Sequence, residues 1–156
     1  MPHEPVPLHP QKQMRVTMML ADYAVGTPDG KLTVVGAGWK LIAVGAPFAV
    51  AAIVEVPWDL TNTKHTLQLR LVDADGQPLT MPDGQPLELP PDVFEVPRPA
   101  GVKPGTSIAH NVVLNSGPLP FEPGQYVWEI TINGAQHEEW KLPFTVVAAG
   151  PQAQAA

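Results

Sequence analysis

The sequence contains no cysteine, and only two of its 156 residues are serine. Without cysteine the chain can form no disulfide, no thiolate metal site and no cysteine nucleophile, and its composition fits a reducing compartment. Neither Ser107 nor Ser116 lies in the Gly-x-Ser-x-Gly turn that exposes a catalytic hydroxyl. Ser107 and His110 are three residues apart on a predicted strand, so their side chains point to opposite faces. The sequence therefore argues against nucleophilic catalysis.

Positive charge is also scarce: 9 Lys and Arg residues stand against 15 Asp and Glu residues, and the net charge is −6. Binding to a nucleic-acid backbone or to an anionic membrane depends on clusters of Lys and Arg, which the sequence lacks. The longest uncharged stretch, residues 41–54, is too short to span a bilayer and is interrupted by Gly45 and Pro47. The sequence has neither a phosphate-binding Gly-Lys-Ser/Thr loop nor a dinucleotide fingerprint. We therefore expect no nucleic acid, no membrane and no cofactor as partner.

Proline and glycine are abundant instead, with 20 and 13 residues, and they separate short apolar runs as turns separate strands. Residues 1–13 carry four prolines, which predicts a flexible extended arm. Residues 148–156 are small or polar and predict a flexible tail. The N-terminus has no basic segment followed by an apolar run, as a secretory signal would have. We therefore expect a protein that is made in the cytoplasm, with residues 14–147 as its single domain.

The strongest structural signal is the alternation of apolar and polar residues over residues 125–147, which predicts a β-hairpin with one buried face. On either side of Asn133-Gly134 the apolar positions are Tyr126, Trp128, Ile130 and Ile132, then Trp140, Leu142, Phe144 and Val146. A two-residue Asn-Gly turn would place Trp128 opposite Glu139, so that a core residue would face a residue on the solvent side. Keeping both aromatic rows on one face needs a loop with an odd number of residues, such as residues 133–137, or a bulge. We expect Trp128 and Trp140 to be buried on the same face.

Shorter runs of β-forming residues recur along the chain, and no window has the pattern of an amphipathic helix. About nine or ten strands at this spacing predict an all-β fold, a sandwich of two antiparallel sheets. The pentapeptide Asp-Gly-Gln-Pro-Leu occurs twice, at residues 75–79 and 83–87. Each Asp-Gly indicates a turn, and each proline limits strand pairing. We therefore predict a protruding loop over residues 73–91.

Two parts of the sequence resemble known families. The segment Pro123-Gly-Gln-Tyr126-Val-Trp128 resembles the start of a late strand in immunoglobulin-like domains, with Trp128 in the place of the usual second cysteine. Residues 14–80 resemble a family of small uncharacterised proteins, a domain of unknown function, from high-GC Gram-positive bacteria and their phages. That resemblance rests on the segments Leu20-Ala-Asp22, Asp29-Gly-Lys-Leu32, Gly36-Ala-Gly-Trp39, Val56-Pro-Trp58, His65-x-Leu-x-Leu-x-Leu71 and Asp73-Ala-Asp-Gly76. It implies a small β-rich fold and an association with phages, and it carries no assigned activity.

Candidate metal ligands are few. Asp73-Ala-Asp75-Gly76 is similar to a calcium-binding loop, but Gly76 falls too early and no glutamate follows at the EF-hand position. A looser calcium site formed by Asp73, Asp75 and Asp83 is one alternative, and aspartates that close turns are the other. A composite site formed by His65, His110 and a remote aspartate is weighed against a structural His65 at a strand start. We predict no metal centre and keep the three aspartates as the alternative.

Two tryptophans and two glutamates complete the candidates. Trp39 and Trp58 flank predicted turns, where a tryptophan either contacts a partner or closes the end of the core. Glu55 and Glu129 could meet across a sheet, but nothing in the sequence marks this carboxylate pair as catalytic.

Three functions remain open: a non-enzymatic structural or interaction module, a binder of a carbohydrate or apolar ligand held by Trp39 or Trp58, and a hydrolase with a composite site. We favour the first. The arm, the loop 73–91 and the tail would dock a protein partner or another copy of the chain. An accessory or decoration subunit of a phage head or tail is one such module, and the protein would then also occur in the virion.

Overall fold

The computed structural model describes residues 13–149 of the chain, and the prediction of an all-β fold is confirmed over that range. The predicted arm and tail lie almost entirely outside the described residues. Two short 3-10 turns, η2 (Trp58–Leu60) and η3 (Glu138–Trp140), interrupt the strands. The described strands are β1 (Arg15–Ala21), β2 (Tyr23–Gly26), β3 (Leu32–Val35), β4 (Leu41–Ala43), β5 (Phe48–Val56), β6 (Lys64–Asp73), β7 (Asp92–Glu95), β8 (Ile108–Ser116), β9 (Gly124–Ile132) and β10 (Lys141–Val147).

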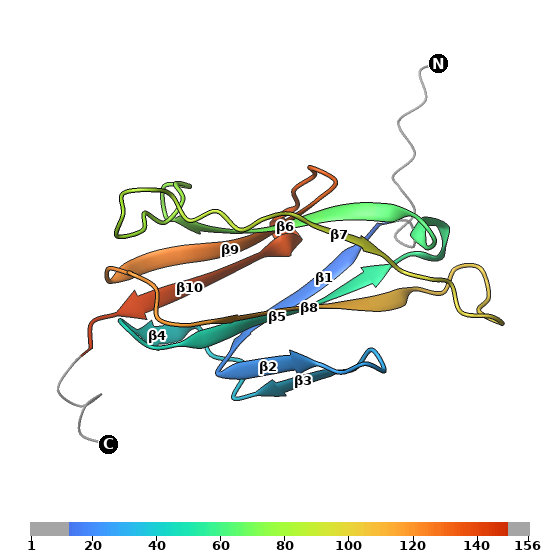
Figure 1. The fold of residues 1–156 in the computed structure, drawn as a ribbon, viewed down its shortest axis with the longest axis horizontal. Helices are drawn as coiled ribbons and strands as arrows, with labels where there is room; N and C mark the ends of the chain where they lie inside the picture. The colour runs from blue at the N-terminus through green and yellow to red at the C-terminus, as the bar shows by residue number, and fades with distance from the viewer. Residues whose placement is uncertain (1–12, 150–156) are drawn as a thin grey trace, which may run out of the picture.

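The strands form three sheets, where the sequence predicted two (Figure 1). One sheet has the order β1-β5-β8, a second has the order β4-β10-β9-β6-β7, and β2 pairs with β3 in a third. All strand pairs are antiparallel except β10 with β4, which is parallel. Figure 1 shows the two larger sheets one above the other, with the β2–β3 hairpin as an additional layer on the outside.

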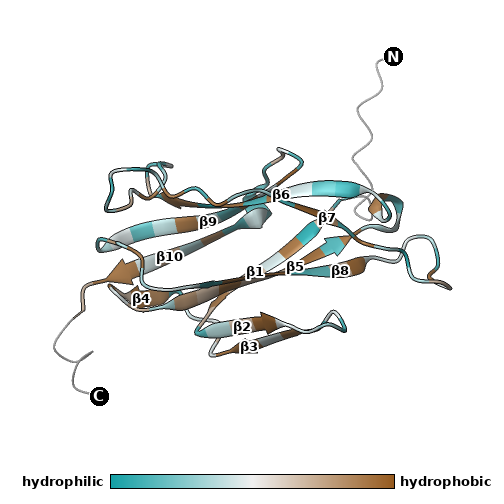
Figure 2. Cartoon of the chain, viewed as in Figure 1, coloured by the Kyte–Doolittle hydropathy of each residue, from teal (hydrophilic) through white to brown (hydrophobic). Residues whose placement is uncertain are grey.

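The core lies between the two larger sheets, where alternate residues of their strands point inward. Figure 2 shows the hydrophobic segments along these strands. Trp128 is 0% exposed, and its ring centroid lies 6.1 Å from that of Phe48 on the opposite sheet. Phe48 also lies 6.1 Å from Phe121, which in turn lies 4.8 Å from Tyr126. Tilted and edge-on ring pairs of this kind add to the hydrophobic stabilisation that comes from burying the rings. The aromatic residues of the C-terminal half therefore fill the centre of the fold.

The β9–β10 hairpin keeps its two core rows on one face through an interruption of the ladder after a tight turn, and not through the odd loop over residues 133–137. Asn133 and Gly134 both have positive φ, 53° and 78°, and Ile132 pairs directly with Ala135 in a tight turn. The chain then leaves the ladder through η3 and rejoins it with Leu142 opposite Trp128. The expected burial of Trp128 and Trp140 in one core is confirmed, although Trp140 reaches that core from the 3-10 turn rather than from a strand.

Residues 73–91 form a loop whose leucines contact the domain while most of its other residues are exposed. Each Asp-Gly closes a tight turn, and the two turns place Leu79 beside Leu71 of β6 and Leu87 beside Leu79. The backbone N–H of Leu79 donates to the carbonyl of Leu71, and that of Leu87 donates to the carbonyl of Leu79 at 2.7 Å. Leu79 is buried in the core. The loop packs against β6 here because the leucine of each repeat supplies an apolar side chain that can be buried.

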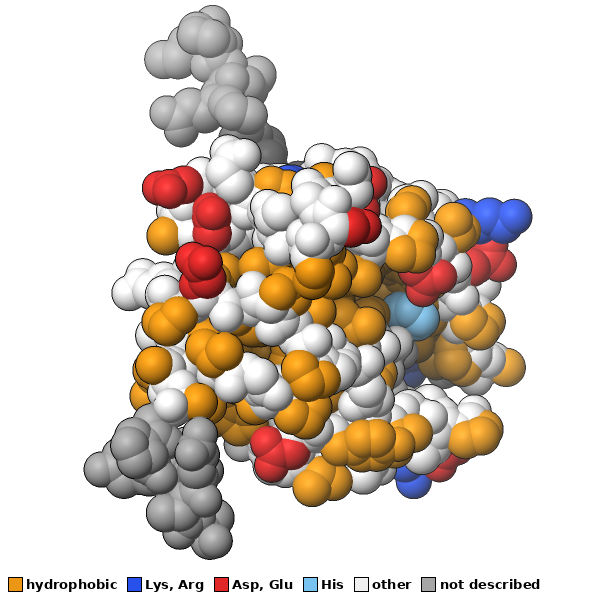
Figure 3. Space-filling model, turned by 60° about the vertical axis from the view of Figure 1, so that its left-hand side comes forward, with side chains coloured by type: hydrophobic (Ala, Val, Ile, Leu, Met, Phe, Trp, Pro, Cys, Tyr) orange, Lys and Arg blue, Asp and Glu red, His pale blue; other side chains and the backbone are white. Residues whose placement is uncertain are grey.

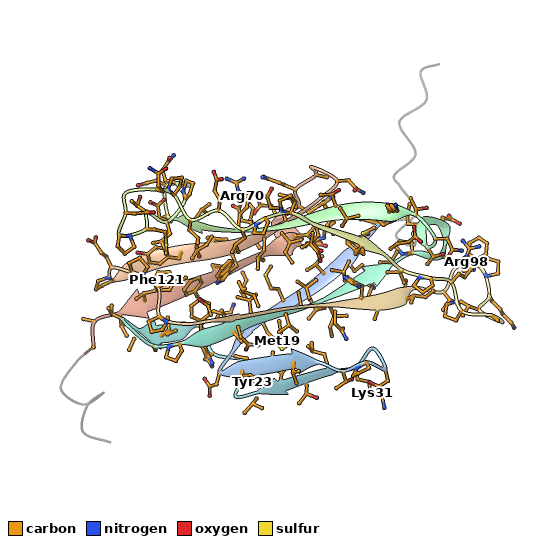
Figure 4. All side chains as sticks on the ribbon, viewed as in Figure 1. Met19, Tyr23, Lys31, Arg70, Arg98 and Phe121 are labelled. Atoms are coloured by element: carbon orange, nitrogen blue, oxygen red, sulfur yellow. The ribbon has the colours of Figure 1, made fainter. Side chains whose placement is uncertain are left out.

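The β2–β3 hairpin packs on the outer face of the three-stranded sheet, over a floor of small residues. Ala49 and Ala51 of β5 are fully buried there together with Ala21 and Ala24. Met19 points from β1 toward this layer (Figure 4). Because alanine has no side chain beyond Cβ, the hairpin backbone can approach the sheet closely. The sequence prediction did not include this layer, since the run Phe48–Val56 gives no sign of which partner covers its second face.

Polar side chains of β8 fasten the hairpin. Asn115 donates to the carbonyl of Ala24 at 2.7 Å and accepts from the N–H of Ala24 at 3.2 Å, and Asn111 donates to the carbonyl of Gly30 at 2.7 Å. At the base of the hairpin, a Cβ on Gly36 would collide with the carboxylate of Asp22. A glycine is therefore required there, both for space and for its positive φ of 62°.

Candidate interaction surface

The structure does not bring the candidate catalytic residues together. Glu55 lies on β5 with its side chain on the same face as Ala49 and Ala51, the outer face of the three-stranded sheet. Glu129 lies between the buried Trp128 and Ile130 and so points to the outer face of the five-stranded sheet. The core separates the two carboxylates. Ser107 is exposed in the connection before β8, and its neighbour His110 points inward from that strand.

His65 and His110 are joined through an aromatic ring and not through a metal site. Phe94 of β7 stacks on His110 with 4.4 Å between ring centroids and an interplanar angle of 7°, and His65 lies 5.4 Å away on the other side. The Nε2–H of His65 donates to the carbonyl of Leu60 at 2.8 Å, and its Nδ1 accepts from Asn133 at 3.0 Å. Because both ring nitrogens are used, His65 has a structural role.

His110, the second histidine of this stack, is half-buried. Burial lowers the pKa of His110 because the charged imidazolium loses hydration, and the carboxylate of Asp92 partly offsets this effect. His110 belongs to β8, at the edge of the three-stranded sheet, and its ring contacts Phe94 of β7 in the five-stranded sheet. The stack therefore fixes the spacing of the two sheets at this end of the domain.

The three candidate calcium ligands are placed in turns. Asp73 accepts hydrogen bonds from the N–H groups of Asp75 and Gln77, both at 2.9 Å, and Asp83 accepts from that of Gln85 at 2.9 Å. These are the bonds by which aspartate closes a turn. Within the part of the chain that the structure describes, no three His, Asp or Glu side chains converge as metal ligands.

The two candidate tryptophans are half-buried supports of the core rim. The guanidinium carbon of Arg98 lies 3.6 Å from the ring centroid of Trp58, and Arg98 also donates to the Trp58 carbonyl at 2.9 Å and to Thr61 at 2.9 Å. A cation above an indole face is a favourable contact. Trp39 packs on the main core. Arg98, which Figure 4 shows at the end of the domain, was not among the candidates because nothing in its local sequence points to Trp58.

The hollows on the surface of residues 13–149 include three with volumes of about 200, 360 and 250 Å³. The largest lies on the outer face of the five-stranded sheet and is lined by Lys40, Gln125 and Pro143 among others. Neither Trp39 nor Trp58 lines any of the three.

The edges of the sheets differ sharply in how they are protected. Proteins keep edge strands from pairing with other chains by making them short, by charging them or by covering them. β4 has three residues, and β7 has four residues with Asp92 and Glu95 at its ends. β1 begins with Arg15, and the carbonyl of its Leu20 already accepts from Gly38. Each of these three edges has at least one of the usual protections.

β8 has none of them. It is nine residues long, reads Ile-Ala-His-Asn-Val-Val-Leu-Asn-Ser, and contains no Lys, Arg, Asp, Glu or Pro. It pairs with β5 on one side, and no other described strand pairs with it. Among residues 13–149, no backbone group outside the sheet bonds to its open side. β8 therefore presents an unpaired row of N–H and C=O groups.

The inward face of β8 is also incompletely covered. Ile108, Val112 and Leu114 are half-buried against the core, whereas every inward residue of the neighbouring β5 is buried. Figure 3 shows broad areas of hydrophobic side chains on the surface, with a hollow beside a histidine. The open edge and the half-covered row together form the candidate interaction surface, which we call the β8 rim.

Comparisons with known proteins identify a family without assigning an activity. The model of the Family of unknown function (DUF6941) matches residues 16–147, a longer part of the chain than the sequence resemblance covered. No curated protein matches the chain. A solved structure, the alkylpurine DNA glycosylase AlkC of Pseudomonas fluorescens bound to DNA with an abasic site analog, is similar at 13% identity and a TM-score of 0.42. The match covers 86% of this chain and 30% of that protein. None of the helices described here is long and apolar enough to cross a membrane.

Proposed function

We propose that this chain, which belongs to the family of unknown function DUF6941, is a non-enzymatic interaction module that binds a protein partner by strand addition at the β8 rim. The observation that carries the proposal is the nine-residue edge of β8, which is uncharged, free of proline and unpaired on one side. An extended segment from a partner can add to such an edge through backbone hydrogen bonds. The rim then acts as the binding site.

The strand order supports an immunoglobulin-like arrangement of the two larger sheets, which we propose with the function. The order β1-β5-β8 corresponds to the first three strands of a four-stranded A-B-E-D sheet, and β6, β9 and β10 correspond to the C-F-G sheet. The hydroxyl of Tyr126, at the start of β9, donates to the carbonyl of Glu122 at 2.9 Å and accepts from its N–H at 3.2 Å. This matches the tyrosine corner of such domains. In this reading β8 lies beside the position of a missing fourth strand.

The chemistry of the rim defines what it would accept. Backbone groups supply the affinity in strand addition, and alternate side chains of the added strand supply the specificity. The half-exposed row of Ile108, Val112 and Leu114 favours apolar residues at every second position of the partner. Covering this row would remove apolar surface from water, which contributes about 25 cal/mol per Å². The partner segment is therefore extended, uncharged and alternately apolar.

A module of this kind suits a repeated assembly, and the decoration subunit of a phage head or tail remains our proposal for its setting. Residues 1–13 and 148–156 would add contacts in such an assembly, and this part of the proposal rests on the sequence alone. The loop 73–91 would add contacts through its exposed residues, while its leucines face the domain. Synthesis in the cytoplasm and a place in the virion belong to the same proposal.

The alternatives have no comparable support. A carbohydrate or apolar ligand would need an accessible indole face, and that of Trp58 is occupied by Arg98. A hydrolase would need a nucleophile or carboxylate pair in reach of a base, and Glu55 and Glu129 lie on opposite outer faces.

The test uses a synthetic extended peptide with valine and threonine in alternation, titrated into the full-length protein and followed by the NMR signals of the backbone amides. We expect shifts concentrated in Ile108–Ser116. The matched control is the same peptide with alternate backbone nitrogens methylated, so that one edge cannot donate hydrogen bonds, and it should cause no such shifts. Equal effects from both peptides, or shifts confined to other strands, would reject strand addition at β8.

A further inference from the structure

We infer that the strand received by the β8 rim is β8 of a second copy of this chain, paired antiparallel across a two-fold axis. The inference rests on the proposed function and names its partner. It joins two three-stranded sheets into one continuous six-stranded sheet. A two-fold contact uses the same surface on both copies, so the strand has to be complementary to itself.

The sequence of β8 meets this requirement when Val112 lies on the axis. Ile108 then faces Ser116 of the second copy, and His110 faces its Leu114. On the outer face Ala109 lies opposite Asn115, and Asn111 lies opposite Val113. In this antiparallel register, two facing residues are either both even-numbered or both odd-numbered. Every inward residue therefore meets an inward residue. The half-exposed apolar row of each copy is continued by that of the other.

Charge also favours this strand over the facing edge. The whole chain carries a net charge of −6, so two copies repel each other over most of their surfaces. β8 contains no charged residue and brings none together. The facing edge, β7, offers only four residues for pairing, and two of them, Asp92 and Glu95, are carboxylates that self-pairing would bring close to those of the second copy. Like charges brought close together repel each other. β8 is longer than β7 and has no such charges.

The hairpin on the outer face does not use the backbone groups of β8 that strand pairing needs. The β2–β3 hairpin is held by the side chains of Asn111 and Asn115, which point away from the sheet and not along its edge. The backbone of β8 takes no part in these bonds. The hairpin is therefore held without using the open-side backbone groups of β8.

Sedimentation equilibrium of the full-length protein over a range of concentrations tests the inference. We expect a reversible monomer–dimer equilibrium for the natural sequence. Val112→Lys and Val112→Glu each place two like charges on the axis, and each should sediment as a monomer at concentrations where the natural protein is a dimer. An equimolar mixture of the two variants should form a heterodimer, since the introduced lysine of one copy then meets the introduced glutamate of the other.

Val93→Lys is the matched control, because it places a charge on the exposed residue of the opposite edge strand and should leave the dimer unchanged. Thermal melts verify that each variant folds. If the Val112 variants do not fold, the natural protein alone decides the question through its mass. A natural protein that stays monomeric throughout overturns the second-copy inference. In that case, peptide shifts in Ile108–Ser116 would still uphold strand addition, whereas their absence would remove both proposals.

Discussion

β5 and β8 are neighbours in the same sheet and have nine residues each, yet their burial is opposite. Seven residues of β5 are buried, and none of β8 is. β5 has a strand on each side, the main core on one face and the hairpin layer on the other. β8 has a strand on one side only. Because Ile108, Val112 and Leu114 are apolar and yet only half-buried, the exposure of β8 reflects its position at the rim as well as its polar residues.

The comparison also separates what stabilises the domain from what is available for binding. The inward residues of β5 pack against the aromatic core and lose almost all contact with water. Those of β8 are largely apolar as well, but they are only half-buried in the single chain. A fold that leaves such a row uncovered gains stability when a further strand covers it.

The largest expected effect is on the β5 side of the comparison. Trp128→Ala removes a fully buried indole that lies 6.1 Å from Phe48 of β5. Because the cavity cannot collapse between two sheets, we expect the free energy of unfolding to fall by about 3–5 kcal/mol. Denaturant titration measures this loss. A loss below about 1 kcal/mol would contradict the central place of Trp128 in the core.

A matched pair of valines compares the two strands directly. Val54 of β5 and Val112 of β8 point to the same face of the sheet, but only Val54 is fully buried. We expect Val54→Ala to cost about 2–3 kcal/mol and Val112→Ala about 1 kcal/mol, in dilute solution where β8 is unpaired. Equal costs in the same denaturant titration would mean that the rim of β8 is as well covered as β5.

The hairpin layer should respond locally. Asn115→Ala removes both hydrogen bonds to Ala24, so we expect the opening of β2 and β3 to become easier by about 1–2 kcal/mol. Amide exchange within Tyr23–Val35 should accelerate, while exchange in β5 and β9 stays unchanged. Lys31→Ala is a control, since its exposed side chain contacts Asp29 at the tip and not the sheet. Uniform acceleration across the domain would show that the hairpin is not a separate layer.

The smallest effect concerns pH and the stack that ties the β8 rim to β7. Burial lowers the pKa of His110 below its usual value of about 6.5, so the unfolded chain binds the proton more readily than the folded one. Stability contributed by the neutral ring is present above that value and is lost as the pH falls below it. We expect the free energy of unfolding to decrease modestly from pH 7.5 to 5.5, and to decrease less in His110→Phe. A larger decrease in His110→Phe would contradict this assignment.

Much of the fold was predictable because strand alternation and turn residues act locally. The alternation in residues 125–147 identified the hairpin that holds Trp128, and the parity of Asn133-Gly134 showed that a bulge or odd loop had to follow. The two Asp-Gly turns were also recognised. These features depend on neighbouring residues, which the sequence displays directly.

The β8 rim was less predictable because it depends on the absence of a neighbouring strand on one side of β8. The composition of β8 is apparent in the sequence, but its place at the end of a sheet is not. The alanines of β5 gave no sign of the hairpin that covers them, and the distant Arg98 gave no sign of its contact with Trp58. Edges and layers arise from pairing between segments far apart in the chain, and alternation within a segment does not specify them.

Amide hydrogen exchange in β8, measured residue by residue at low and at high protein concentration, tests the central claim most directly. In an antiparallel pair, alternate N–H groups of β8 bond to β5 and the others point to the open side. The account predicts that the open-side amides within Ile108–Ser116 exchange rapidly in dilute protein and slowly in concentrated protein, while the amides bonded to β5 are slow in both. Open-side amides that exchange equally fast at every concentration, with or without the extended peptide, would show that this edge receives no strand.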